Sequence, residues 1–159
     1  MSRTVPLGRE RTFRPAAFRF RCPVQHWGAM TQQDVESVRR FYAAWSASDL
    51  PAMLEVADRD IEAQPVLGLL YKRPSYRGHS GISQWFEEVV DLWDAFEPRV
   101  EDAREVDGSV VAFLHLVARS GSRTSDARIA VVCKVDGGKI VSIRGRDRDE
   151  LAEELGIHA

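Results

Sequence analysis

The apolar residues of this chain change their spacing once along the sequence, and that change restricts the folds that the chain can adopt. Before about residue 98, apolar side chains recur every three or four residues, which is typical of helices that bury one face. From Arg99 onwards, apolar and polar residues alternate, which is typical of half-buried strands. Helices followed by consecutive strands predict an α+β domain with its helices packed on one face of a bent antiparallel sheet.

Three helices are predicted in the first half of the chain. A first helix is expected over about 31–47, because Thr31-Gln32-Gln33-Asp34 has the spacing of a capping box. Asp49 is expected to cap a short second helix, whose first turn accommodates Pro51. A third helix is expected to begin at His79. The apolar positions that carry these patterns are Val35, Val38, Phe41, Tyr42 and Trp45, then Leu50, Met53, Leu54 and Ala57, then Ile82, Trp85, Phe86, Val89, Leu92, Trp93 and Phe96.

Alternating residues predict four strands in the second half, over about 98–106, 109–119, 126–135 and 139–146. An Asp-Gly pair and an Asp-Gly-Gly run between them indicate hairpin turns. A further short strand is expected at Ile61–Gln64, after a turn at 58–60. A terminal helix is expected around Leu151, Leu155 and Ile157, capped by Asp147 or Asp149.

The first 29 residues differ in composition from the rest. They contain six arginines and one acidic residue, without helical or strand periodicity. We interpret residues 1–29 as a disordered or spurious basic extension, with a basic arm for an acidic partner as the alternative. Residues 30–159 are expected to form one domain. They hold 16 basic and 23 acidic residues by subtraction from totals of 22 and 24, and this acidic balance argues against nucleic-acid binding.

Membrane, metal and cofactor functions are not indicated by the sequence. No apolar run approaches the ~18–20 residues of a membrane helix. Cys22 and Cys133 lie far apart and have no metal-ligand spacing. There is also no phosphate-binding loop. We therefore expect no metal, no cofactor and a cytoplasmic location.

Several short strings carry a resemblance to a known family. They are, in order, Val38–Trp45 with Asp49-Leu50, then Asp60–Glu62, Tyr76–Gly81, Asp126–Ala130, Asp136–Ile140 and Arg144–Asp147. Together they resemble the SnoaL-like and ketosteroid isomerase branches of the nuclear transport factor 2-like superfamily. The resemblance implies a cone-shaped half-barrel, in which a curved antiparallel sheet wraps around three N-terminal helices and encloses a central pocket. It also implies a dimer as the common assembly.

The resemblance allows the steroid-isomerase roles to be compared with this sequence. Those enzymes use a carboxylate base, a tyrosine and a protonated aspartate. The base position falls on Gln64, whose neutral amide accepts no proton at ordinary pH. The tyrosine position falls on Phe41, with Tyr42 one position away, and the aspartate position falls on Val131 or Ala130. Steroid-isomerase chemistry is therefore disfavoured.

The expected pocket is mostly apolar and suits a small apolar molecule. In the strand at 126–135, alternation places Val131 and Cys133 on the face that the resemblance assigns to the pocket, unless a β-bulge shifts the alternation. For Tyr42 and Trp45, packing in the core is the alternative to contact with a ligand. The residues expected to contact the molecule are Tyr42, Trp45, Gln64, Tyr76, Trp85, Trp93, Val131 and Cys133.

Four residues are candidates for catalysis. Histidine titrates near neutral pH, so His79 is a candidate acid or base, with packing or capping at a helix start as the alternative. Asp126 and Arg128 share one face of a strand. Together with Asp147 they are similar to the Asp–Arg–Asp arrangement of limonene epoxide hydrolases, which belong to this superfamily. A surface ion pair and a helix cap are the alternatives for these residues.

Two functions follow from this sequence. One is a SnoaL-like isomerase, cyclase or hydrolase of an apolar substrate. The other is a non-catalytic ligand-binding or dimeric scaffold domain, because Phe41, Gln64 and Val131 occupy the positions where relatives place reactive groups. A module that recognises another protein is a third reading. A homodimer through the outer sheet face is expected, because Phe113, His115 and Val117 crowd one face of a strand; pocket lining is the alternative for His115.

Overall fold

The structure, a computed structural model, describes residues 24–65 and 74–156. Residues 1–23 of the predicted extension, Cys22 and Ile157 lie outside the described residues. The chain divides into two units, Met1–Gln33 and Asp34–Ala159. The described part of the first unit, residues 24–33, belongs to helix α1 (Val24–Ser46). The predicted helix cap at Thr31 is wrong, because α1 begins at Val24 and Thr31 lies within it. Good helix formers such as Met30 and Gln32 favour the helix in this part of the sequence.

The second unit contains two short helices between α1 and the main strands. Helix α2 (Leu50–Glu55) begins at the predicted cap, where the carboxylate of Asp49 accepts a hydrogen bond from the backbone N–H of Ala52 at 3.2 Å. Helix α3 (Gly78–Leu92) ends earlier than its apolar pattern suggested, because Trp93 already has an extended backbone that leads into a strand. Among the described helices, none combines the length and the apolarity that a membrane crossing requires.

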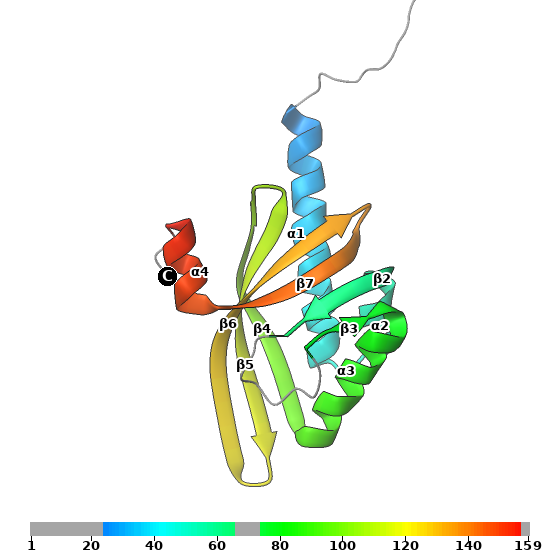
Figure 1. Cartoon of the computed structure of the whole chain (residues 1–159), viewed down its shortest axis with the longest axis vertical. Helices are drawn as coiled ribbons and strands as arrows, with labels where there is room; N and C mark the ends of the chain where they lie inside the picture. Colours follow the sequence, from blue (N-terminus) through cyan, green and yellow to red (C-terminus); the bar gives the residue numbers. More distant parts are fainter. Residues whose placement is uncertain (1–23, 66–73, 157–159) are drawn as a thin grey trace, which may run out of the picture. The chain divides into compact units, whose positions relative to one another are not determined.

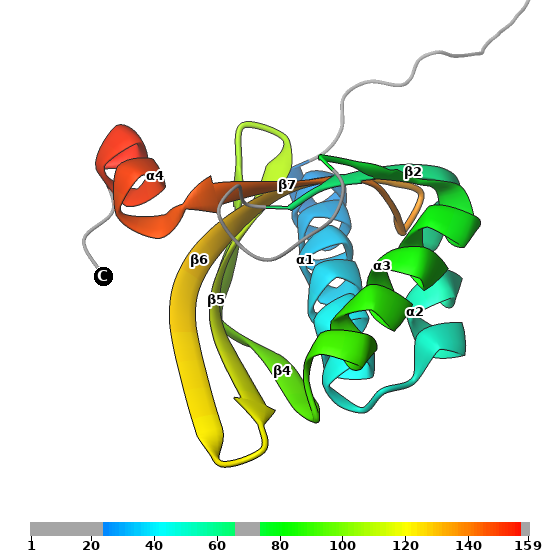
Figure 2. The same ribbon diagram turned by 60° about the horizontal axis from the view of Figure 1, so that its bottom comes forward.

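Six strands form one curved sheet in the order β3-β2-β7-β6-β5-β4. Neighbouring strands are antiparallel, except that β2 and β7 are parallel. Strands β4 to β7 are the four predicted from alternation, and their bounds lie within three residues of the prediction. Figures 1 and 2 show α3 and the part of α1 from Asp34 onwards on the concave side of the sheet. The strands are β2 (Ala57–Gln64), β3 (Tyr76–Arg77), β4 (Ala95–Val106), β5 (Ser109–Ser120), β6 (Arg123–Asp136) and β7 (Lys139–Asp147).

The turn predicted at 58–60 is wrong, because these residues lie within β2. The turn-forming residues still make this part of the strand irregular. The carboxylate of Asp58 accepts a hydrogen bond from the backbone N–H of Asp60 at 2.9 Å. The pairing of β2 with β7 also shifts register between Ala57 and Glu62. A local side-chain hydrogen bond here produces an irregular strand in place of a chain reversal.

The two faces of the sheet bury different clusters. Leu114 and Leu116 of β5 belong to the main core between sheet and helices, whereas Val111 and Phe113 belong to a second cluster on the opposite face. Helix α4 (Arg148–Leu155) covers this second cluster and inserts Leu151 into it. Phe113 is only 2% exposed. The expectation that Phe113 forms part of an exposed patch is therefore wrong, because the terminal helix covers it.

Candidate functional site

A narrow cavity lies between the helices and the concave face of the sheet. Its non-atom space is about 380 Å³, some of it open to solvent, but the centre of a water-sized sphere moves through only about 20 Å³ of it. The cavity is therefore a slot that side chains nearly fill. The residues that line it are Tyr42, Trp45, Gln64, Pro65, Trp85, Phe96, Pro98, Leu114, Leu116, Ile129, Val131, Ile143 and Gly145.

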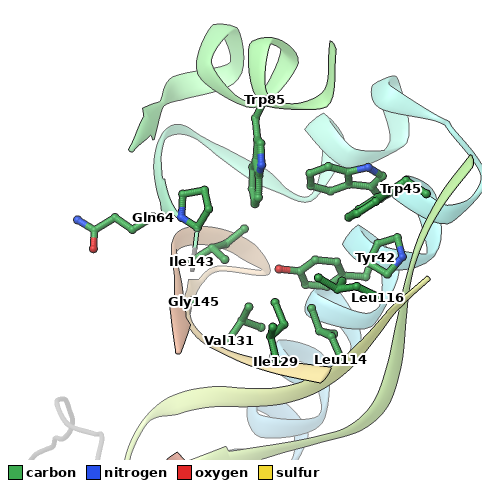
Figure 3. Close-up of a pocket in the computed structure, with 13 residues that line it drawn as sticks. Tyr42, Trp45, Gln64, Trp85, Leu114, Leu116, Ile129, Val131, Ile143 and Gly145 are labelled. Carbon is green, nitrogen blue, oxygen red and sulfur yellow. The ribbon is translucent and has the colours of Figure 1, made fainter. Parts of the chain in front are cut away.

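The side chains around the slot show which groups face its interior (Figure 3). The ring of Tyr42 on α1 reaches across the slot, and its hydroxyl oxygen points toward Ile143 and Val131. The indole of Trp85 descends from α3. The amide of Gln64 points away from the other lining side chains. The polar atom of the lining that is seen to enter the slot is thus a phenol oxygen, which both donates and accepts hydrogen bonds.

Aromatic rings fix the helical side of the slot. Trp45 is central, because its ring lies 4.7 Å from that of Trp85, 5.8 Å from that of Phe96 and 6.1 Å from that of Phe41. Trp85 is also stacked on Tyr76, with ring centroids 5.7 Å apart. Edge-to-face and offset stacked pairs of this kind stabilise a packed arrangement beyond the area that they bury. The helical wall is therefore a rigid aromatic layer.

Five of the residues expected to contact a ligand lie in the lining, and three do not. Tyr76 lies behind Trp85, and Trp93 packs at the edge of the core. Cys133 is fully buried in the main core, and burial raises the pKa of its thiol to about 12. Its sulfur is consequently a protonated, unreactive packing group at neutral pH. The five in the lining are Tyr42, Trp45, Gln64, Trp85 and Val131.

None of the four residues expected to be catalytic lines the slot. The Nε2 atom of His79 lies 2.9 Å from the backbone oxygen of Ala57, a contact that ties α3 to β2. Asp147 caps α4 by accepting a hydrogen bond from the N–H of Glu150 at 2.9 Å. These placements match the capping and packing alternatives for His79 and Asp147.

Asp126 and Arg128 alternate with Ile129 along β6 and so lie on the face of the sheet away from the slot. The guanidinium of Arg128 donates to Glu101 at 3.2 Å. That hydrogen bond, followed by weaker charge effects from nearby cations, lowers the pKa of Glu101. The structure therefore does not bring Asp126, Arg128 and Asp147 together around one water-binding point.

Several lining residues were not among the predicted ligand contacts. Leu114, Leu116 and Ile129 were recognisable as residues of one sheet face by alternation, but alternation does not say where along a strand the helices leave space. Gly145 gave no signal, since it contributes backbone alone. Pro98 and Phe96 lie at the start of β4, where the helical and strand periods overlap in the sequence.

An open polar hollow adjoins the slot and shares three of its residues, Gln64, Pro65 and Gly145. Arg146 in this hollow forms an ion pair with Glu154 at 2.8 Å. The hollow contains equal numbers of basic and acidic side chains, so it selects no ligand charge. Its other residues are Pro74, Ser75, Arg144, Asp147 and Glu150.

Groups of histidine, cysteine and carboxylate side chains that could hold a metal ion are absent from residues 24–65 and 74–156. Within the slot lining, no side chain is charged. General acid–base catalysis needs a titratable group within hydrogen-bond reach of the reacting atom. The lining offers Tyr42 as a proton donor and no carboxylate or imidazole.

The fold and the slot can be compared with known proteins. The structure resembles Bal32a from a soil-derived mobile gene cassette, with a TM-score of 0.67 and 21% identity over 79% of this chain and 96% of that one. It also resembles TerC co-crystallized with polyporic acid, with a TM-score of 0.65 and 18% identity over 77% and 97% of the two chains.

A third similar structure is a protein from Xanthomonas campestris pv. campestris that was provisionally named a polyketide cyclase. Its TM-score is 0.59, with 16% identity over 79% of this chain and 96% of that one. Another neighbour is a nuclear transport factor 2-like protein from Burkholderia pseudomallei, with a TM-score of 0.64. These TM-scores show a shared fold. The chain matches no curated protein. Residues 38–143 match the family model of the SnoaL-like domain, and the chain therefore belongs to the SnoaL-like domain family.

Proposed function

We propose that the domain binds one small, flat, mostly apolar molecule in the slot, without catalysis by a carboxylate or an imidazole. The observation that carries this proposal is the composition of the lining, in which no side chain is charged. Burial of apolar surface contributes about 25 cal/mol per Å². A ligand without charge therefore gains from entering the slot, whereas a charged group would lose its hydration there.

The shape of the slot favours flat rings. Trp45 and Trp85 present aromatic edges and faces to the slot, and such surfaces pack well against another ring system. Because the space free for a water-sized sphere is about 20 Å³, a ring-sized ligand must displace side chains as it enters. The Tyr42 hydroxyl supports a ligand with one carbonyl or hydroxyl group.

Calorimetric titration with 2-naphthol tests the proposal. A contribution of about 0.5 kcal/mol per non-hydrogen atom gives this probe a Kd of about 100 μM. Val131→Trp should abolish binding by filling the slot. Val90→Trp is the matched control, because Val90 is 52% exposed, and it should bind as the wild type does. Thermal unfolding of both variants checks that they are folded, and Ile129→Phe provides a milder block. Equal binding by all four proteins would show that the probe does not occupy the slot.

A second candidate function is enzymatic, as an isomerase, cyclase or hydrolase that uses Tyr42. Two observations support it: the hydroxyl points into the slot, and one structural neighbour was provisionally named a polyketide cyclase. A tyrosine serves as a general acid when it reaches the reacting atom. Mass spectrometry should then detect a product from a bound aromatic ketone. Tyr42→Phe should stop turnover while the ligand still binds, and a product formed equally well by this variant would rule out Tyr42.

We further propose a homodimer through the outer sheet face, beside α4. Although Phe113 is covered, His115 and Val117 on the same face of β5 are only partly buried. A second copy would bury the remaining exposed surface of these side chains. Light scattering at micromolar concentration should give twice the chain mass of 17.9 kDa, and a monomer mass would contradict the proposal. The cytoplasmic location stays a prediction from the sequence.

A further inference from the structure

Tyr76 occupies a fixed position behind the slot. Its backbone in β3 pairs with Ala63 of β2 at the edge of the sheet. Its side chain is 2% exposed. The hydroxyl donates a hydrogen bond to the Oε1 atom of Glu88 at 2.6 Å, and the ring stacks on Trp85 with an angle of 13° between the ring planes. Tyr76 is thus held at its backbone, its ring and its hydroxyl.

Both partners of the Tyr76 side chain come from one side of helix α3. Trp85 and Glu88 are three residues apart and therefore lie on neighbouring turns of the same helix face. Gly81, one turn earlier, lets the backbone of Tyr76 approach the helix: a Cβ atom at this glycine would lie 3.0 Å from the Tyr76 carbonyl carbon. The close contact of β3 with α3 therefore depends on the missing side chain at Gly81.

Trp85 lies between this anchor and the slot. On one face it is stacked on Tyr76, and on another side it meets Trp45 at 4.7 Å with an angle of 86°. Trp85 lines the slot, whereas Tyr76 and Glu88 do not. Any movement of Tyr76 away from Trp85 would give the indole room to swing back, which would widen the slot.

We propose that Tyr76 and Glu88 are positioning residues that hold the indole of Trp85 and thereby set the size of the ring system that the slot accepts. The inference rests on the proposed binding of a flat apolar ligand, and it adds the residues that determine ligand size. A hydrogen bond to a carboxylate is stronger than one between neutral groups. The Tyr76–Glu88 hydrogen bond is therefore suited to keep the Tyr76 ring in place when a ligand contacts Trp85.

The first test compares a two-ring probe, 2-naphthol, with a three-ring probe, 2-anthrol, by calorimetry. Tyr76→Leu removes the stacked ring and should change the ratio of the two Kd values by about tenfold in favour of 2-anthrol. Tyr76→Phe keeps the ring but lacks the hydroxyl, and it should move the ratio in the same direction by less. Glu88→Ala should resemble Tyr76→Phe. Glu88→Gln should move the ratio less than Glu88→Ala does, because its amide oxygen still accepts a hydrogen bond, although a weaker one.

The matched control is Glu87→Ala, which removes an exposed carboxylate from the same helix and should leave the ratio unchanged. A residue that only stabilises the fold lowers the melting temperature and weakens both probes equally. If Tyr76→Leu and Glu88→Ala lower the melting temperature while the Kd ratio stays at the wild-type value, the proposed positioning role is wrong.

A second measurement needs no ligand, so it separates this proposal from the proposed function. Fluorine NMR of protein labelled with 5-fluorotryptophan reports the surroundings of each indole, and Trp85→Phe assigns the Trp85 signal. Tyr76→Phe and Glu88→Ala should shift or broaden that signal. Glu88→Gln should do so less, and Glu87→Ala should not do so. If the wild-type protein binds neither probe while the variants show these shifts, only the proposed ligand class is contradicted. An unmoved Trp85 signal in Tyr76→Phe and Glu88→Ala would overturn the positioning role.

Discussion

The indoles of Trp45 and Trp85 meet edge to face, with ring centroids 4.7 Å apart and an angle of 86° between their planes. Trp45 belongs to α1 and Trp85 to α3, so this contact joins two helices that are separated in sequence by α2, β2 and β3. Both rings are nearly fully buried and both line the slot. The same pair therefore contributes to the stability of the core and to the shape of the slot.

Replacement of Trp45 by alanine should destabilise the domain strongly. The side chain contacts three other aromatic rings within 6 Å of its centroid, and loss of a buried ring of this size costs about 3–5 kcal/mol. Urea unfolding measures the change. Trp93→Ala is the comparison, since Trp93 is only partly buried, and its loss should be clearly smaller. Equal losses would show that Trp45 is not central to the core.

The thiol of Cys133 should make the domain less stable in alkali. Burial raises its pKa from 9.0 to about 12, so between these values the unfolded chain releases a proton that the folded chain retains. Unfolding is then favoured as pH rises, by about 1.4 kcal/mol per pH unit at most. Urea unfolding at about pH 8 and about pH 10 should show a smaller loss for Cys133→Ala than for the parent. Both proteins should carry Cys22→Ala, so that Cys133 is the single thiol of the parent and Cys133→Ala has none. Identical slopes would contradict the raised pKa.

Removal of the Asp147 carboxylate should weaken α4 without affecting the slot. Asp147 accepts a hydrogen bond from the N–H of Glu150 in the first turn of the helix, and loss of such a cap costs about 1 kcal/mol. Asp147→Ala should therefore lower the free energy of unfolding by that amount and leave the affinity for 2-naphthol unchanged. Asp149→Ala, in the first turn of the same helix, is the control and should cost less. A large loss of affinity in Asp147→Ala would restore a functional role for this residue.

The Arg128–Glu101 pair should contribute little. Its side chains are 48% and 36% exposed, and exposed pairs contribute about 1 kcal/mol or less. Because the hydrogen bond from Arg128 lowers the pKa of Glu101, the contribution is present above the ordinary pKa of a glutamate and is lost as acid protonates Glu101. Arg128→Gln should therefore lose slightly more stability than Arg123→Gln at neutral pH, and no more in acid. Loss of any turnover in Arg128→Gln alone would instead favour a catalytic role.

The order of elements could be predicted from the sequence, because hydrophobic period depends on local geometry that tertiary contacts rarely override. β4 to β7 follow from alternation, and α2 follows from Asp49 and Pro51. The predictions that were wrong concern residues whose structure depends on partners far away in the sequence. Residues 58–60 carry turn-forming side chains, yet they lie within β2, between the pairs that Ala57 and Glu62 form with β7. Phe113 looked exposed because no local signal indicates that α4 folds back over it.

The apolar lining of the slot could be predicted from the sequence, but its extent along the strands could not. Alternation and helical stripes identified Val131 and Trp45 as inward-facing, and both line the slot. The same reasoning selected Cys133, two residues further along β6, where the packing is complete and no space is left. Whether an inward residue meets another side chain or an empty space depends on the facing helix, and a single strand does not carry that information.

The residues of the slot are spread from Tyr42 on α1 to Gly145 on β7, across nearly the whole folded unit. No short piece of the chain contains the whole lining, so only the fully folded domain presents the slot. Binding and folding are thereby linked: a ligand at a hundred times its Kd would stabilise the domain by about 2.7 kcal/mol. The proposed ligand would therefore stabilise the folded domain, and its depletion should shorten the lifetime of the protein.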